Sequence, residues 1–169
     1  MNVYSIDKLM AEARRLAADY RRATGKTLPI TGEIAIHDAI RFLNLEPAQE
    51  GTAGYDAVRR EGGKVRRFQV KGRTIFDDAK SGHRLGQLKA EQAWDAVLLV
   101  LMDEHYEATE IYEADREEIM EVLRDAGESR RANRGAMSVA RFKVIGRLAW
   151  SREHGLEDDG YWDNDKGQW

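Results

Sequence analysis

Seven consecutive apolar residues, from Ala96 to Met102, constrain the fold of this chain more than any other feature of its sequence. A membrane-spanning helix needs about 20 apolar residues, so this run is too short to cross a bilayer. A run of this length, preceded by Trp94, is typical of a strand that lies inside a sheet and is covered on both faces. We therefore expect a central strand with helices packed on both of its sides.

Two helices are expected before the first strand. Ser5 is predicted to cap a helix that extends to about Thr24. Its buried stripe is predicted to be Leu9, Ala13, Leu16, Ala17 and Tyr20. The Leu28–Pro29 step interrupts the chain, and Thr31 is predicted to cap a second helix that extends to about Asn44.

The strands and the last helices follow from turn signals and periodicity. Residues 55–60 and 64–73 are predicted to form a hairpin around Gly62-Gly63, and a short edge strand is expected around Ile111. Asp115 is predicted to cap a helix that runs through Leu123 and ends at Gly127. Ser138 is predicted to open a last helix that buries Phe142, Ile145, Leu148 and Ala149.

This order of elements predicts a single α/β domain over residues 1–152, with a mixed sheet between helices. Residues 153–169 are predicted to form an acidic tail, since 153–165 contains six acids and no base. The chain has no cysteine, which excludes disulfides and cysteine-based metal sites. With no signal peptide visible at Met1, we expect a cytoplasmic protein.

The net charge of −3 argues against a generally basic nucleic-acid binder but not against a local basic face. Residues 59–84 hold nine Lys and Arg against three acids, and residues 128–147 hold six against one. Two such blocks could share one face, although a basic block is more often ordinary solvated surface.

The predicted hairpin brings three functional side chains together. If Gly62-Gly63 is a two-residue turn, then Glu61 pairs with Lys64 and Asp56 lies across from Gln69. Lys71 projects from the same face as Gln69, because alternate residues of a strand share a face. A slip of one residue in the register would separate the three groups.

A carboxylate, an amide and an ammonium at one point suit the hydrolysis of a phosphodiester. Asp56 would bind Mg²⁺ or Mn²⁺, with the amide oxygen of Gln69 and the backbone carbonyl of Val70 as further ligands. Glu33, in the second predicted helix, is the candidate for a second acidic ligand. Lys71 could orient or deprotonate the attacking water, or offset charge in the transition state.

These residues resemble the PD-(D/E)xK nuclease motif. The resemblance rests on Gly54-Tyr55-Asp56-Ala57, on Gln69-Val70-Lys71, and on Thr31-Gly32-Glu33-Ile34-Ala35 in the preceding helix, and covers roughly residues 30–102. It implies a restriction-endonuclease-like fold, with Asp56 and Glu33 as metal ligands and Lys71 as the catalytic lysine. Tyr55 replaces the proline of the motif and Gln69 replaces its second acid, which makes metal affinity the point in question.

Several basic residues are candidates for contacts with the DNA backbone. Arg67 and Arg73 share the face of Gln69 and Lys71, and His83 and Arg84 follow in a glycine-containing loop. Arg130, Arg131 and Arg134 belong to the second basic block. The simpler interpretation of each is a solvated surface residue.

The sequence therefore predicts a metal-dependent endonuclease that acts on DNA, with restriction or defence as its setting by family analogy. Cleavage of both strands would suit a homodimer, and no membrane association is expected. One alternative is a catalytically inactive module of the same fold that binds nucleic acid or a partner protein. Another is a structural protein that binds no nucleic acid.

Overall fold

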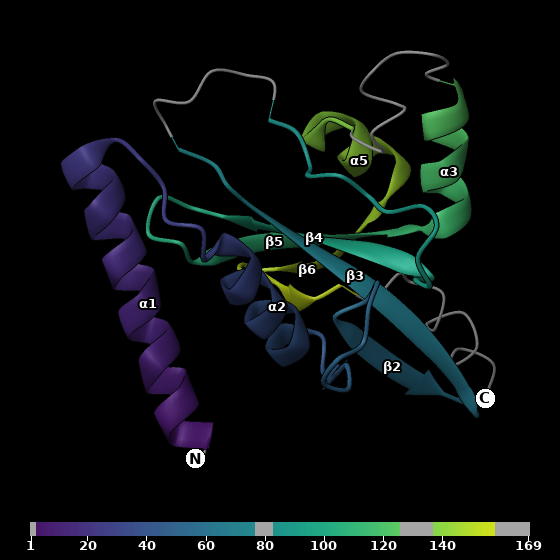
Figure 1. Cartoon of the computed structure of the whole chain (residues 1–169), viewed down its shortest axis with the longest axis horizontal. Coiled ribbons are helices and arrows are strands. Elements are labelled where there is room, and N and C mark those ends of the chain that lie inside the picture. The colour runs from purple at the N-terminus through teal and green to yellow at the C-terminus, as the bar shows by residue number, and fades with distance from the viewer. Residues whose placement is uncertain (1–2, 77–82, 126–136, 158–169) are drawn as a thin grey trace, which may run out of the picture.

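A seven-stranded mixed sheet separates two layers of helices (Figure 1). The computed structural model describes residues 3–76, 83–125 and 137–157. Within these residues the strand order in the sheet follows the chain, and only β3 and β4 are parallel. The strands are β1 (Glu46–Pro47), β2 (Ala57–Glu61), β3 (Lys64–Thr74), β4 (Ala96–Met102), β5 (Ala108–Asp115), β6 (Arg147–Ser151) and β7 (Gly155–Leu156).

Each face of the sheet carries its own hydrophobic core. The helices α1 (Val3–Thr24) and α2 (Thr31–Phe42) cover one face, which includes Phe68 and Val70 of β3. The helices α3 (Arg116–Asp125) and α5 (Val139–Ile145) lie against the other face, with Val97, Leu99 and Leu101 of β4 (Figure 1). All seven residues of β4 are buried. The predicted α/β class, mixed sheet and doubly covered central strand are therefore confirmed.

The predicted hairpin has the predicted register. Glu61 pairs with Lys64 and Ala57 pairs with Phe68. Both residues of the turn, Gly62 and Gly63, have positive φ angles, as a tight two-residue hairpin turn requires. Because the register is the predicted one, the side chain of Asp56, which directly precedes β2, lies on the same face of the sheet as Gln69 and Lys71.

The C-terminal part of the chain differs from the prediction. The last helix ends at Ile145, and Leu148 and Ala149 belong to strand β6 rather than to that helix. A Cβ on Gly146 would lie 2.8 Å from the carbonyl oxygen of Glu113, so the chain turns there in close contact with β5. Because β6 pairs with β5, the strand around Ile111 is internal and not an edge strand. The Ser138 cap is confirmed, since its side chain accepts a hydrogen bond from the Arg141 amide.

The sheet also continues past the predicted domain boundary at residue 152. Strand β7 pairs with β6 through Leu156, so the start of the predicted acidic tail belongs to the sheet. Gly127 lies outside the described residues. No helix in the described part of the chain is long and apolar enough to span a membrane.

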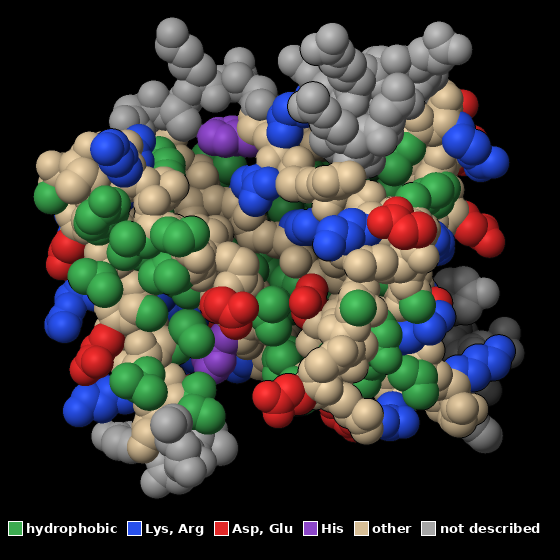
Figure 2. All heavy atoms as spheres, in the orientation of Figure 1, with side chains coloured by type: hydrophobic (Ala, Val, Ile, Leu, Met, Phe, Trp, Pro, Cys, Tyr) green, Lys and Arg blue, Asp and Glu red, His purple; other side chains and the backbone are tan. Residues whose placement is uncertain are grey.

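The first helix buries only part of the predicted stripe, because Ala17 is buried while Leu9, Leu16 and Tyr20 are exposed. Leu9 and Leu16 are 52% and 59% exposed, and Arg14, Ala17 and Ala18 form the buried side. Hydrophobic side chains accordingly gather on the surface over α1 (Figure 2). The helix begins before Ser5, so Ser5 is not its cap. Likewise, Thr31 is the first residue of α2 and makes no side-chain cap.

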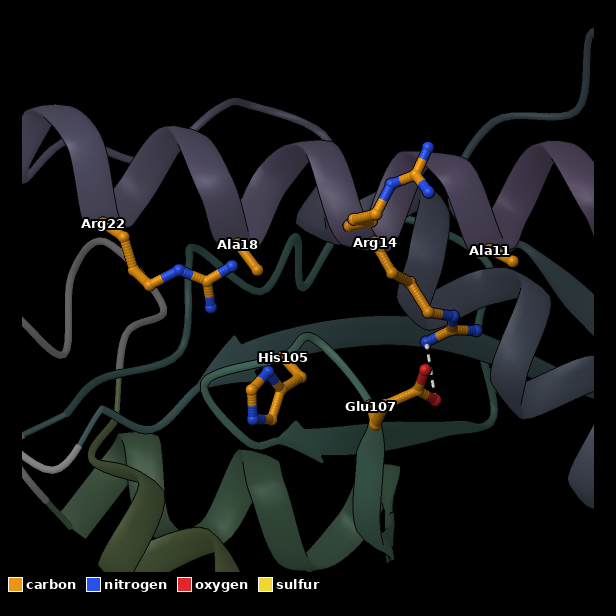
Figure 3. Close-up of a pocket in the computed structure, with 7 residues that line it drawn as sticks. Ala11, Arg14, Ala18, Arg22, His105 and Glu107 are labelled. Atoms are coloured by element: carbon orange, nitrogen blue, oxygen red, sulfur yellow. Dashed lines mark ion pairs between the residues drawn. The ribbon is translucent and has the colours of Figure 1, made fainter.

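Arg14 joins α1 to the rest of the domain. Its guanidinium donates to Asp38 of α2 and, at 2.6 Å, to the carbonyl oxygen of Tyr106 in the β4–β5 turn. Glu107 approaches it to 3.9 Å from the same turn (Figure 3). The buried face of α1 is therefore organised around an ion pair, with small alanines beside it.

Gly72 sets the distance between α2 and the sheet. A Cβ at this position would lie 2.7 Å from the Cβ of Ala35 and 3.0 Å from the terminal methyl carbon of Met102. Gly72→Ala is expected to lower the free energy of unfolding by about 1–3 kcal/mol, the usual range for an overpacked core. Urea denaturation measures this loss, and Ala35→Gly in the same chain should recover part of it. Strictly additive effects of the two substitutions would contradict this contact as the cause.

Candidate functional site

The three residues of the predicted hairpin site lie where β2 begins, beside the middle of β3. The Asp56 amide donates to the carbonyl oxygen of Phe68 at 2.8 Å, and its carboxylate accepts the amide of Val70 at 2.8 Å. The Asp56 carboxylate therefore accepts the hydrogen bond that the Val70 amide would otherwise donate to a backbone carbonyl of a longer β2. Because the carbonyl of Val70 lies on the same strand edge as its amide, it faces the side on which Asp56 lies.

Gln69 has an unpaired oxygen in this position. The residue is 8% exposed, and its amide oxygen Oε1 is buried with no hydrogen-bond partner. A buried acceptor of this kind costs about 1–3 kcal/mol when it is left unpaired. The register places Gln69 across the hairpin from Asp56 on the same face of the sheet. A carboxylate and an unpaired amide oxygen are both suited to bind a cation.

Lys71 lies on the same face, which the sequence also predicted. Burial lowers its pKa, the negative charge of Asp56 raises it, and the positive charges of Arg73 and Lys89 lower it further. No direct ion pair within 4 Å joins Lys71 to Asp56. The two groups thus act on one another through space without direct contact.

Burial also raises the pKa of Asp56, against the opposing effects of the Val70 amide and the Lys71 charge. A carboxyl group with a raised pKa favours folding below its ordinary pKa, and this contribution is lost as the pH rises through the raised value. Ionised Asp56 therefore works against folding at neutral pH. A bound cation would offset this effect, which is typical of a site built for binding rather than for stability.

Among the described residues, the site has more positive than negative side chains. Arg73 donates to the carbonyl oxygens of Arg84 and of Gly72, the latter at 2.6 Å, and burial lowers its pKa. Within the described residues, Arg73 has no carboxylate partner within 4 Å. Asp56 is thus accompanied by Lys71, Arg73 and Lys89, an excess of positive charge that would attract an anion.

The other predicted DNA contacts have different environments. Arg67 is held by Asp95 through its backbone amide at 2.8 Å and its Nε at 3.0 Å. His83 and Arg84 are half-exposed, and their segment pairs with the start of α5 through Arg84 and Ser138. Arg130, Arg131 and Arg134 lie outside the described residues. Arg73 is therefore the predicted contact most closely integrated with the site.

Glu33 is not brought into contact with the three hairpin residues. It is exposed in the first turn of α2, a helix that packs on the face of the sheet opposite to Gln69 and Lys71. The described residues contain no group of three or more His, Asp or Glu side chains that could hold a metal ion. Glu33 as a metal ligand therefore stays a prediction.

A pocket of about 180 Å³ lies elsewhere, between α1 and the β4–β5 turn. Arg22 of α1 and His105 of the turn extend into it, and Arg14 and Glu107 meet at one end (Figure 3). None of the residues predicted for catalysis lines it. The pocket adds nothing to the chemistry of the hairpin site.

Two residues of the site were missed by the sequence interpretation. A Cβ on Gly86 would lie 3.3 Å from the guanidinium of Arg73 and 3.9 Å from the ammonium of Lys71. Lys89 is close enough for its charge to act on Lys71. The sequence signal that could have placed this loop near the site is the spacing of Leu85 and Leu88, two apolar residues that pack the loop against the sheet.

No model of a known protein family matches this chain, and a search of curated proteins finds no similar sequence.

Proposed function

We propose that this chain is a metal-dependent endonuclease with a restriction-endonuclease-like fold that hydrolyses phosphodiester bonds of DNA. The observation that carries the proposal is the unpaired oxygen of Gln69, buried on the face that Asp56 and Lys71 share. The parallel pairing of β3 with β4, beside the β2–β3 hairpin, is compatible with that fold.

The residues present fit a hard divalent cation. Asp56 supplies a carboxylate, Gln69 supplies an amide oxygen with no other partner, and the Val70 carbonyl lies on the same strand edge. Mg²⁺ keeps several water ligands in proteins, so a small set of protein ligands is sufficient. When bound there, Mg²⁺ or Mn²⁺ would supply an acidified water and charge neutralisation for the phosphate.

The protein groups would divide the remaining work. Asp56 is held in one orientation by the Val70 amide, which fixes the position of its oxygens. Lys71, whose pKa is lowered by burial, is suited to accept a proton from the attacking water or to stabilise the pentavalent phosphate. The excess positive charge around the site would attract a nucleic-acid backbone and hold it there.

A second candidate function is a binding module of the same fold without catalysis. The absence of an acidic cluster among the described residues, with a neutral Gln69 at the second ligand position, favours it. Both candidates predict salt-sensitive DNA binding. Only the nuclease predicts that the chain cuts DNA when a divalent ion is added.

The deciding experiment incubates the purified chain with plasmid DNA in Mg²⁺, in Mn²⁺ and in EDTA. We expect nicked or linear DNA with either metal and intact plasmid in EDTA. Binding without cutting in every condition would overturn the nuclease and leave the binding module.

Gln69→Leu tests the metal site separately. Leucine has a similar size and no polar atom, so the variant should gain up to about 1–3 kcal/mol in unfolding free energy by removing the unpaired oxygen. It should lose both cleavage and the rise in Tm that Mg²⁺ gives the parent chain. Thr74→Val is the matched control, because Thr74 also has a buried, unpaired oxygen in β3, on the opposite face. An equal Mg²⁺ effect on Tm in both variants would exclude Gln69 as a ligand.

A further inference from the structure

The loop that crosses the hairpin site is held firmly at both of its ends. Leu85 and Leu88 are 3% and 2% exposed and pack in the core beneath α3 and α5. The Leu85 amide donates to the carbonyl oxygen of Met137, and the Trp94 indole donates to the carbonyl oxygen of Lys89 at 2.8 Å. The backbone from 85 to 89 is therefore fixed in place over β3.

Gly86 brings this loop closest to the site. Its backbone approaches Arg73 and Lys71 so closely that a Cβ would crowd the Arg73 guanidinium at 3.3 Å. The φ angle of Gly86 is not in the left-handed region, so backbone conformation does not require glycine here. Glycine is favoured at position 86 because a side chain there would crowd the ends of Arg73 and Lys71.

Arg73 and Lys89 are positive groups that the described residues leave without a carboxylate within 4 Å. Arg73 uses two of its nitrogens on backbone carbonyls, which orients the guanidinium without neutralising it. Lys89 is exposed, and its charge acts on Lys71 from the loop. Two cations that the described residues leave without a carboxylate, one of them oriented by backbone carbonyls beside a glycine, are features of a phosphate-binding site.

We propose that Arg73, Lys89 and the backbone at Gly86 form a phosphate-binding subsite that holds the nucleic-acid backbone beside Asp56 and Gln69. This inference rests on the proposed function for its ligand, a DNA backbone phosphate. It does not require cleavage, so its test is made without divalent metal.

The experiment measures binding of a fluorescent DNA duplex by anisotropy in EDTA at several salt concentrations. Lys89→Ala should weaken binding at low salt and reduce the slope of log K against log salt by about 1, the value for one lost phosphate contact. Gly86→Ala should also weaken binding, because its new Cβ would push the Arg73 guanidinium out of the orientation that its two hydrogen bonds give it. Tm should stay unchanged, because only the ends of the Arg73 and Lys71 side chains lie within 4 Å of that Cβ.

Lys64→Ala is the matched control, since it removes the same charge from an exposed residue of β3. Lys64 is seven residues from Lys71, about 23 Å along the strand at the usual rise per residue. Equal loss of binding in Lys89→Ala and Lys64→Ala would overturn the subsite and point to a general charge effect. A parent chain that binds DNA with this pattern but never cuts it would overturn the nuclease and keep the subsite.

Discussion

Lys71→Met is expected to lower the rate of DNA cleavage at least about 100-fold, the lower end of the range for a positioned proton-transfer group. Methionine matches the lysine side chain as far as Cε and fills most of the half-buried site, so the fold should be retained. Because burial and neighbouring cations both lower the pKa of Lys71, removing its ammonium should not reduce stability. Cleavage rates under single-turnover conditions and thermal unfolding measure the two effects.

Lys71→Arg separates the two roles that remain open for this residue. Arginine keeps the positive charge but does not lose its proton, so it replaces a charge and not a base. A Lys71→Arg chain as slow as Lys71→Met would identify proton transfer as the main contribution. Lys64→Met serves as the control for a loss of charge on the same strand. Cleavage by Lys71→Met at the parent rate would contradict the assigned role of Lys71.

The geometry of the site was predictable because it follows from short-range rules. A two-residue Gly-Gly turn fixes the register, and the register places Asp56, Gln69 and Lys71 on one face. The loop at Gly86 and Lys89 was not predictable in this way. Its position depends on the packing of Leu85 and Leu88 under two helices that follow later in the chain.

The errors in the predicted fold also come from contacts between residues that are far apart in the sequence. The predicted stripe on α1 correctly includes the buried Ala17, but hydrophobicity alone assigns Leu16 and not Arg14 to the interior. Arg14 is buried because Asp38, 24 residues away, pairs with it. The helix predicted through Ala149 ends before Gly146, where tight contact with Glu113 forces the chain into a new strand.

The Arg14–Asp38 ion pair, which helps to determine the face of α1 that is buried, also gives the largest expected effect on stability. Arg14→Met should lower the free energy of unfolding by about 3–5 kcal/mol, because it leaves the carboxylate of Asp38 buried and unpaired. Asp38 is 0% exposed. The carbonyl oxygen of Tyr106, which accepts a hydrogen bond from the same guanidinium, also loses its donor. Tyr106 has a φ angle of 61°, so the donor that is lost also holds a turn in an unfavourable conformation. Urea denaturation measures the change.

Two further variants show whether charge or packing is responsible. Arg15→Met changes the neighbouring exposed arginine and should alter the unfolding free energy by less than about 0.5 kcal/mol. Arg14→Met combined with Asp38→Leu removes both charges and should recover much of the loss, since an apolar pair of similar volume often replaces a buried ion pair well. If the loss of unfolding free energy in the double variant equals the summed losses of Arg14→Met and Asp38→Leu alone, the contribution of Arg14 comes from packing and from the Tyr106 carbonyl. If the double variant recovers stability, the buried charge of Asp38 is what makes Arg14 necessary on a helix face whose other fully buried residues are Ala17 and Ala18.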